Sequence, residues 1–100
     1  MRHIELSEAR HNAIHELTRS MRLKAAEKQA LGYPDDWRED DFGMLDLRLL
    51  KECIELKEEL DKIIRGGVDF EAARRECADV GFCVAMIHDK INSLEGKHEE

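Results

Sequence analysis

The sequence predicts an all-α protein, an antiparallel helical bundle of about three main helices. Hydrophobic residues make up 42% of the chain and charged residues 39%, a mixture typical of solvated helices rather than of disorder. The chain has one proline, and Leu, Glu, Lys, Arg and Ala are abundant, which favours long helices over short strands. Residues 1–100 suffice for one small domain, so we expect association with further copies to complete the core.

The first predicted helix begins near Ser7, a residue type that commonly caps helix N-termini. It runs through residues 8–31, "EARHNAIHELTRSMRLKAAEKQAL". Gly32 ends it and Pro34 follows, which is the usual order of residues at a helix stop.

A loop is predicted at residues 33–43, with Trp37 as the only tryptophan of the chain. The second helix is expected from about Met44 to Ile64, before Arg65 and two glycines. The third is expected from about Phe70 to Ser93, capped by Asp69. The remaining residues, 94–100, are predicted to form a flexible tail.

Charge and cysteine usage exclude several classes of function. The chain carries 16 basic and 23 acidic residues, so we do not expect it to bind a nucleic acid polymer. No apolar run approaches the roughly 20 residues that span a bilayer, and none resembles a signal peptide, so a cytoplasmic protein without a membrane partner is expected. Cys53, Cys77 and Cys83 lie in apolar helical stretches, which predicts buried free thiols rather than a zinc site.

Acidic residues occupy the predicted buried faces of two helices. In the third helix, Glu76 and Asp79 are three residues apart and fall on its apolar arc. In the second, Glu52, Glu55 and Glu59 form a stripe along the edge of the buried face. Buried carboxylates are protonated, paired with a base or bound to a metal, and several that converge raise one another's pKa. A divalent cation such as Mg²⁺ removes that repulsion, and helical bundles hold metals in this way.

Ion pairing is the alternative explanation for these acids. Glu76 and Asp79 would then have a basic partner on the first helix, for which the candidates are Arg10, Arg19 and Lys24. Within the second helix, the spacing allows i, i+4 pairs of Arg48 with Glu52, Lys51 with Glu55, and Glu58 with Lys62.

Three further residue groups carry weaker signals. His11 and His15 have a spacing that can hold zinc, but no third ligand is evident. Trp37 either packs onto the end of the bundle or offers a platform on which a base stacks. The basic residues of the first helix mainly form a solvated face: Arg19, Arg22, Lys24 and Lys28. One or two of them could contact a phosphate at the mouth of an acidic site.

Two segments, "KECIEL" and "RRECADV", resemble the acidic signature of the MazG-like superfamily of all-α nucleoside triphosphate pyrophosphohydrolases. That signature is E-E-x-x-E on one helix and E-x-x-D on the next. Glu52 and Glu55 match the first part, and Glu76 and Asp79 match the second. Lys51 departs from the pattern because it stands where the first acid is expected, which leaves the number of bound metals open. The segment "MRLKAAEKQALGYPDDW" also resembles part of some small phage-type members.

The resemblance implies hydrolysis of an NTP or dNTP to the monophosphate and pyrophosphate. It implies that Glu52, Glu55, Glu76 and Asp79 hold Mg²⁺, or Mn²⁺, with Glu55 acting on the attacking water. Lys24 and Trp37 would contact the substrate, and the subunits would pair as a homodimer or a dimer of dimers. The alternative is a non-catalytic helical interaction or oligomerisation protein whose acids form interhelix salt bridges.

Overall fold

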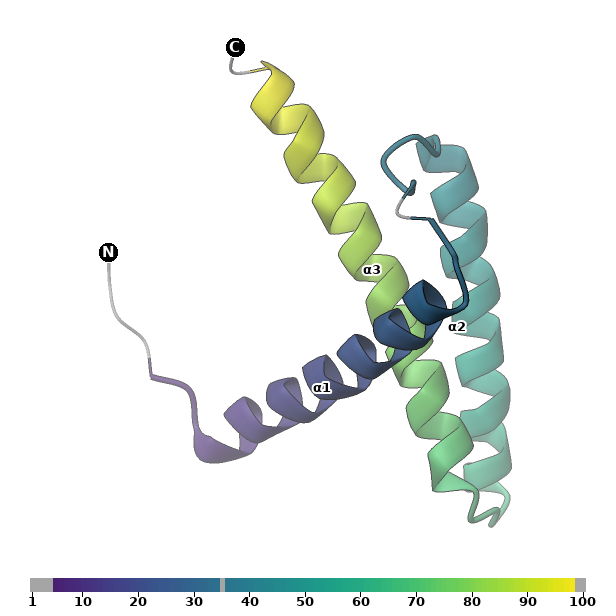
Figure 1. The fold of residues 1–100 in the computed structure, drawn as a ribbon. Coiled ribbons are helices and arrows are strands. Elements are labelled where there is room, and N and C mark those ends of the chain that lie inside the picture. The colour runs from purple at the N-terminus through teal and green to yellow at the C-terminus, as the bar shows by residue number, and fades with distance from the viewer. Residues whose placement is uncertain (1–4, 35, 99–100) are drawn as a thin grey trace.

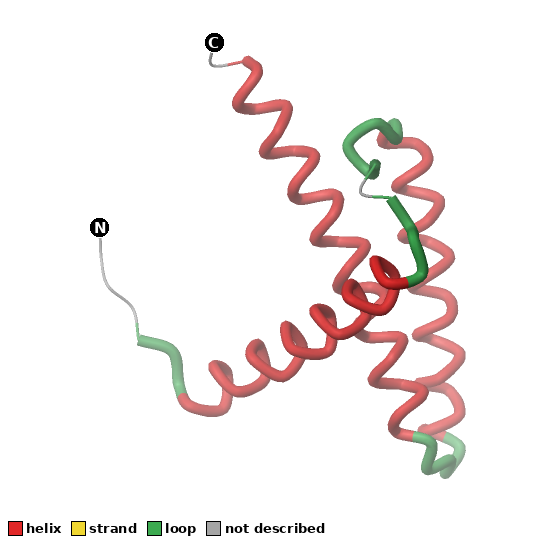
Figure 2. The backbone as a smooth tube through the Cα atoms, viewed as in Figure 1, coloured by secondary structure: helices red, strands yellow, loops and turns green. Residues whose placement is uncertain are grey.

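Three helices and no strand form the described part of the computed structural model, residues 5–34 and 36–98 (Figure 2). They are α1 (Glu8–Ala30), α2 (Phe42–Ile64) and α3 (Phe70–His98). The prediction of an all-α fold with three main helices is therefore confirmed for these residues. None of the described helices is long and apolar enough to cross a bilayer.

The predicted capping residues set the helix ends. Ser7 Oγ accepts a hydrogen bond from Arg10 N at 3.2 Å, and Gly32 ends α1 with a positive φ of 87°. Helix α2 begins two residues before the predicted start, because the Asp41 side chain accepts a hydrogen bond from Met44 N at 2.8 Å. Asp69 caps α3 by accepting one from Ala72 N at 3.1 Å.

The turn between α2 and α3 needs both of its glycines. Gly66 has a φ of 98°, a left-handed conformation that residues with a Cβ rarely adopt. Gly67 has no room for a Cβ, because that atom would lie 2.8 Å from the Lys62 carbonyl oxygen. The tight turn allows α2 and α3 to form an antiparallel hairpin (Figure 1).

The third helix does not end near Ser93 as predicted, because α3 continues to His98, within the segment predicted as a flexible tail. Leu94 continues the apolar spacing of the helix, and Gly96 lowers helix stability by only about 1 kcal/mol, so nothing in this segment stops the helix. Residues 99 and 100 lie outside the described residues.

Helix α1 does not lie alongside the other two as an antiparallel bundle predicts. It crosses α3 near the middle of that helix, and its N-terminal half extends away from the hairpin (Figure 1). Gly81 permits the close crossing, since a Cβ there would lie 2.8 Å from Met21 Sδ. No residue of α1 is fully buried, so α1 contributes little to the core.

The hydrophobic core is small, and its members belong to α2 and α3. Its buried apolar members among the described residues are Leu45, Ala73, Ala78, Cys83 and Met86. The prediction of buried thiols is correct for Cys83 and wrong for Cys53 and Cys77, which are exposed. These two lie on sides of their helices that no other helix of this chain covers.

We expect Gly67→Ala to destabilise the fold by about 1–3 kcal/mol, because its Cβ meets the Lys62 backbone oxygen and the turn must deform. Gly96→Ala serves as the matched control, since no atom lies within 4 Å of its Cβ position, and it should stabilise α3 by up to about 1 kcal/mol. Urea unfolding followed by circular dichroism measures both. Equal stability of Gly67→Ala and the wild type would contradict this turn geometry.

Candidate metal centre

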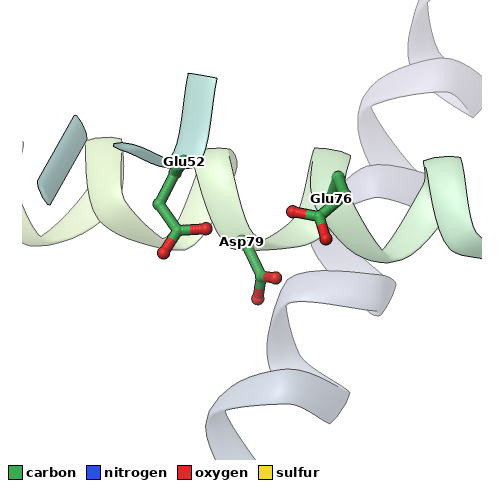
Figure 3. A group of neighbouring side chains, drawn as sticks. All are labelled: Glu52, Glu76 and Asp79. Atoms are coloured by element: carbon green, nitrogen blue, oxygen red, sulfur yellow. The ribbon is translucent and has the colours of Figure 1, made fainter. Parts of the chain in front are cut away.

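Three carboxylates converge where α2 faces α3. Glu52 comes from α2, and Glu76 and Asp79 come from consecutive turns of α3 (Figure 3). One oxygen atom from each of them lies within 4.8 Å of the others. The i, i+3 spacing places the two α3 acids on one side of their helix, as predicted. This separation allows one cation to contact all three groups.

The converging oxygens lack hydrogen-bond partners among the described residues. Glu52 Oε2, Glu76 Oε2 and Asp79 Oδ1 are shielded from solvent and accept no hydrogen bond. Lys24 Nζ lies 3.3 Å from Asp79 Oδ1, which makes an ion pair but lacks the direction of a hydrogen bond. No Lys or Arg nitrogen of the described chain lies within 4.0 Å of Glu52 or Glu76. The cluster therefore has more negative charge than its neighbours neutralise.

Burial and mutual repulsion raise the pKa of two of these acids. The pKa of Glu52 is raised mainly by burial and then by the negative charges of Glu55 and Asp79. The pKa of Glu76 is raised by burial, and then by Asp79, Glu55 and Glu52. These are the shifts expected of carboxylates that share one site without a cation.

The structure brings together three of the four predicted metal ligands. Glu55 is half-buried and close enough for its charge to affect Glu52 and Glu76, but its oxygens do not join the converging group. Its roles as ligand and as base stay predictions. Glu59, the other acid of the stripe, is held by Lys62 at 2.9 Å.

The alternative ion pairs are correct in only one case. Of the three basic residues of the first helix that were candidate partners, Lys24 does contact Asp79. Within α2, Lys62 pairs with Glu59 and not with Glu58, so that prediction is wrong. Arg48 forms an ion pair with Asp40, at 3.6 Å, and not the predicted pair with Glu52.

A cavity of about 640 Å³ opens beside Glu52. Its walls come from α1, the loop after it, α2 and α3. Three of the lining residues are cationic, Lys28, Arg48 and Lys51, and three are aromatic, Tyr33, Trp37 and Phe82. Of the three cations, only Lys28 was predicted to contact a phosphate. Sequence reasoning missed Arg48 and Phe82 because only the fold brings the start of α2 and the middle of α3 to the same cavity.

The loop that carries Trp37 is fastened to α3 by one carboxylate. Trp37 Nε1 donates a hydrogen bond to Asp89 Oδ2 at 2.8 Å, and Arg38 binds both oxygens of Asp89 at 2.7 and 2.9 Å. These hydrogen bonds hold the pKa of Asp89 well below its ordinary value. The indole meets the Phe82 ring edge-on, with ring centroids 6.5 Å apart. Trp37 is therefore half-buried in the cavity wall, in a fixed orientation.

The remaining predicted residues lie elsewhere. Lys24 does not line the large cavity; it contacts Asp79 and borders a separate hollow of about 370 Å³ between α1 and α3. His11 and His15 are exposed on α1 with their rings stacked at 6.4 Å, and they do not belong to the acidic group. Comparisons with protein-family models, curated proteins and solved structures found no match to this chain.

The raised pKa values predict how stability depends on pH without metal. Glu52 and Glu76 ionise at pH 4.5 when unfolded but at higher pH when folded, so their contribution to stability falls as pH rises above about 4.5. Glu76→Gln should therefore raise the melting temperature at pH 7 in EDTA. Glu71→Gln is the matched control on the exposed side of α3. Thermal unfolding measures both, and a lower melting temperature for Glu76→Gln would contradict mutual repulsion at the site.

Proposed function

We propose that this protein is a Mg²⁺-dependent nucleotide pyrophosphohydrolase that converts an NTP or dNTP to the monophosphate and pyrophosphate. The single observation that carries the proposal is the convergence of Glu52, Glu76 and Asp79, each with a shielded oxygen that accepts no hydrogen bond. Hard carboxylate oxygens are the ligands that Mg²⁺ prefers, and Mn²⁺ accepts the same set. The resemblance of the two acidic segments to the MazG-like signature supports the choice of reaction.

The three carboxylates would hold the cation at the edge of the large cavity. Mg²⁺ held by these residues would lower the pKa of a nearby water and neutralise part of the charge on the triphosphate. Glu55 is half-buried next to this cluster, and in this proposal it accepts the proton of the attacking water. Attack of that water at the α-phosphorus breaks the α–β anhydride bond, so that pyrophosphate leaves with its charge partly neutralised.

The cavity has the chemistry that a nucleoside triphosphate requires. The cationic groups of Lys28, Arg48 and Lys51 give positive charge for phosphate oxygens. Trp37 offers an aromatic wall for a base. Lys51, which stands where the signature has an acid, adds a positive charge beside Glu52 that would favour the substrate over a further metal ion.

A second candidate function is favoured by one observation, the ion pair of Lys24 with Asp79. In that case the acids are structural, and the protein is a non-catalytic helical interaction module. Two facts weigh against it: Glu52 and Glu76 have no basic partner within the described residues, and a cavity adjoins Glu52.

Release of monophosphate and pyrophosphate from a panel of NTPs and dNTPs, with Mg²⁺ or EDTA, tests the proposed reaction. We expect metal-dependent turnover that Asp79→Asn lowers about 100-fold or more, because a metal ligand supplies several kcal/mol and each 1.36 kcal/mol is tenfold in rate. Asp61→Asn is the control, since Asp61 contacts only Lys57 on the exposed side of α2. Full activity of Asp79→Asn would show that Asp79 is not a metal ligand.

Lys24→Met separates the two candidate functions. Without metal, both predict a lower melting temperature, because the variant removes the one cation paired with the cluster. If the acids bind metal, millimolar Mg²⁺ should restore the melting temperature, since the ion replaces the lost positive charge. If the acids are structural, Mg²⁺ should leave the melting temperature unchanged. Lys57→Met, which removes an exposed ion pair of α2, controls for non-specific salt effects.

A further inference from the structure

Asp89 of α3 binds two consecutive residues of the loop between α1 and α2. Its Oδ2 accepts hydrogen bonds from Trp37 Nε1 at 2.8 Å and from Arg38 Nε at 2.7 Å, and its Oδ1 accepts one from Arg38 Nη2 at 2.9 Å. The next residue of the helix adds a further hydrogen bond, because Lys90 Nζ donates to the Arg38 carbonyl oxygen at 2.8 Å. Side chains of α3 therefore bind both the side chains and the backbone of this loop.

Asp89 and Phe82 contact Trp37 from the same side of α3. They are seven positions apart, so their side chains leave the helix within about 20° of one another. The Trp37 and Phe82 rings meet at an interplanar angle of 74°, and the indole N–H is hydrogen-bonded to Asp89. An aromatic contact and a hydrogen bond at different atoms of the indole fix both the position and the plane of its ring.

The hydrogen bond to Asp89 limits what Trp37 offers to a molecule in the large cavity. An indole has one hydrogen-bond donor and no acceptor, and Asp89 already binds that donor. Trp37 nevertheless lines the cavity, so the part of it that remains for a ligand is the surface of its ring. Aromatic rings stack on any nucleobase, because every base has a π-face. Trp37 is therefore suited to bind a planar base without selecting among bases by hydrogen bonding.

We propose that Asp89 is a positioning residue, which fixes the indole of Trp37 so that the base of a nucleotide stacks on it. The inference rests on the proposed function, which places the nucleotide in the cavity beside Glu52. Asp89 is not among the described residues that line this cavity, so it acts through Trp37 and not on the nucleotide itself. Its effect is therefore confined to the base, whereas the phosphates depend on other groups.

The competing role for Asp89 is to fasten the loop through its ion pair with Arg38 alone. Both oxygens bind Arg38, which would be sufficient for that purpose, but Oδ2 also accepts the indole N–H. The two roles differ in what they require of residue 89. Fastening through Arg38 requires the negative charge, whereas positioning of Trp37 requires an acceptor atom at the place of Oδ2.

Equilibrium binding measured by calorimetry with Mg²⁺ separates these roles. One ligand is a nucleoside triphosphate whose α–β bridging oxygen is replaced by a methylene group, so that bond cannot be hydrolysed. The other is inorganic tripolyphosphate, which has no base. We expect Asp89→Ala to weaken binding of the nucleotide analogue about 10-fold, because stacking contributes about 1–3 kcal/mol per base, and to leave tripolyphosphate binding unchanged.

Asp89→Asn is the matched control, since it removes the same charge and keeps an oxygen that accepts the indole N–H. We expect its affinity for the nucleotide analogue to stay within about 3-fold of the wild type, less than half of the free energy of a 10-fold change. Equal losses in Asp89→Asn and Asp89→Ala would overturn the proposal in favour of the ion pair. Loss of tripolyphosphate binding in Asp89→Ala would also overturn it, because the effect would not be confined to the base.

A double-mutant cycle with Trp37→Leu tests whether Asp89 acts through the indole. Trp37→Leu removes the stacking surface and should itself weaken binding of the analogue about 10-fold. In the Trp37→Leu background, Asp89→Ala should cause no further loss, because the ring that it positions is absent. Additive losses would show that Asp89 acts by another route and would overturn the proposal.

The binding tests are independent of turnover, so failure of this inference is distinguishable from failure of the proposed function. Binding of the analogue with the expected losses, but without hydrolysis of any natural nucleotide, would remove the proposed function and leave the role of Asp89 standing. Metal-dependent hydrolysis with an unchanged KM in Asp89→Ala would do the reverse. A wild type that does not bind the analogue would overturn the inference.

Discussion

Repulsion among three half-buried carboxylates is the constraint on which the rest of this structure depends. Glu52, Glu76 and Asp79 come together because α2 and α3 are antiparallel and joined by a tight turn, which needs the positive φ of Gly66 and has no room for a Cβ at Gly67. Partial burial of these acids and their mutual repulsion both cost free energy, and together they raise the pKa of Glu52 and of Glu76. A fold with so small a core has little stability to spare for this cost, so a cation bound at the proposed site would also stabilise the fold.

Helix α1 and the following loop bring the opposite charge and the aromatic surface. Lys24 reaches Asp79, while Lys28 lies in the wall of the large cavity with its Nζ 5.2 Å from the centre of the Phe82 ring. The loop is fixed not by hydrophobic burial but by Asp89, which binds Trp37 and Arg38 together. Part of the positive charge near the acids therefore comes from α1, and its position depends on where α1 crosses α3.

Local signals in the sequence were sufficient for much of this architecture. Capping residues such as Ser7 and Asp69, and the glycines after α1 and α2, located the helices to within two residues except at the end of α3. Helical periodicity also placed Glu76 and Asp79 on one buried side of α3. The steep crossing of α1 was not predictable in this way, because it depends on a contact between Gly81 and Met21, which are 60 positions apart in the sequence. The pairing of Lys62 with Glu59 instead of Glu58 was missed because both spacings are compatible with a helix.

The environment of Trp37 gives the protein an intrinsic optical signal. It is the only indole in the chain, it donates a hydrogen bond to a carboxylate, and its ring forms part of the cavity wall. Its emission wavelength and intensity depend on that hydrogen bond and on the polarity of the cavity. Any molecule that enters the cavity therefore changes a fluorescence spectrum to which no other tryptophan contributes. Occupancy can be followed without a label, an added dye or a chemical reaction.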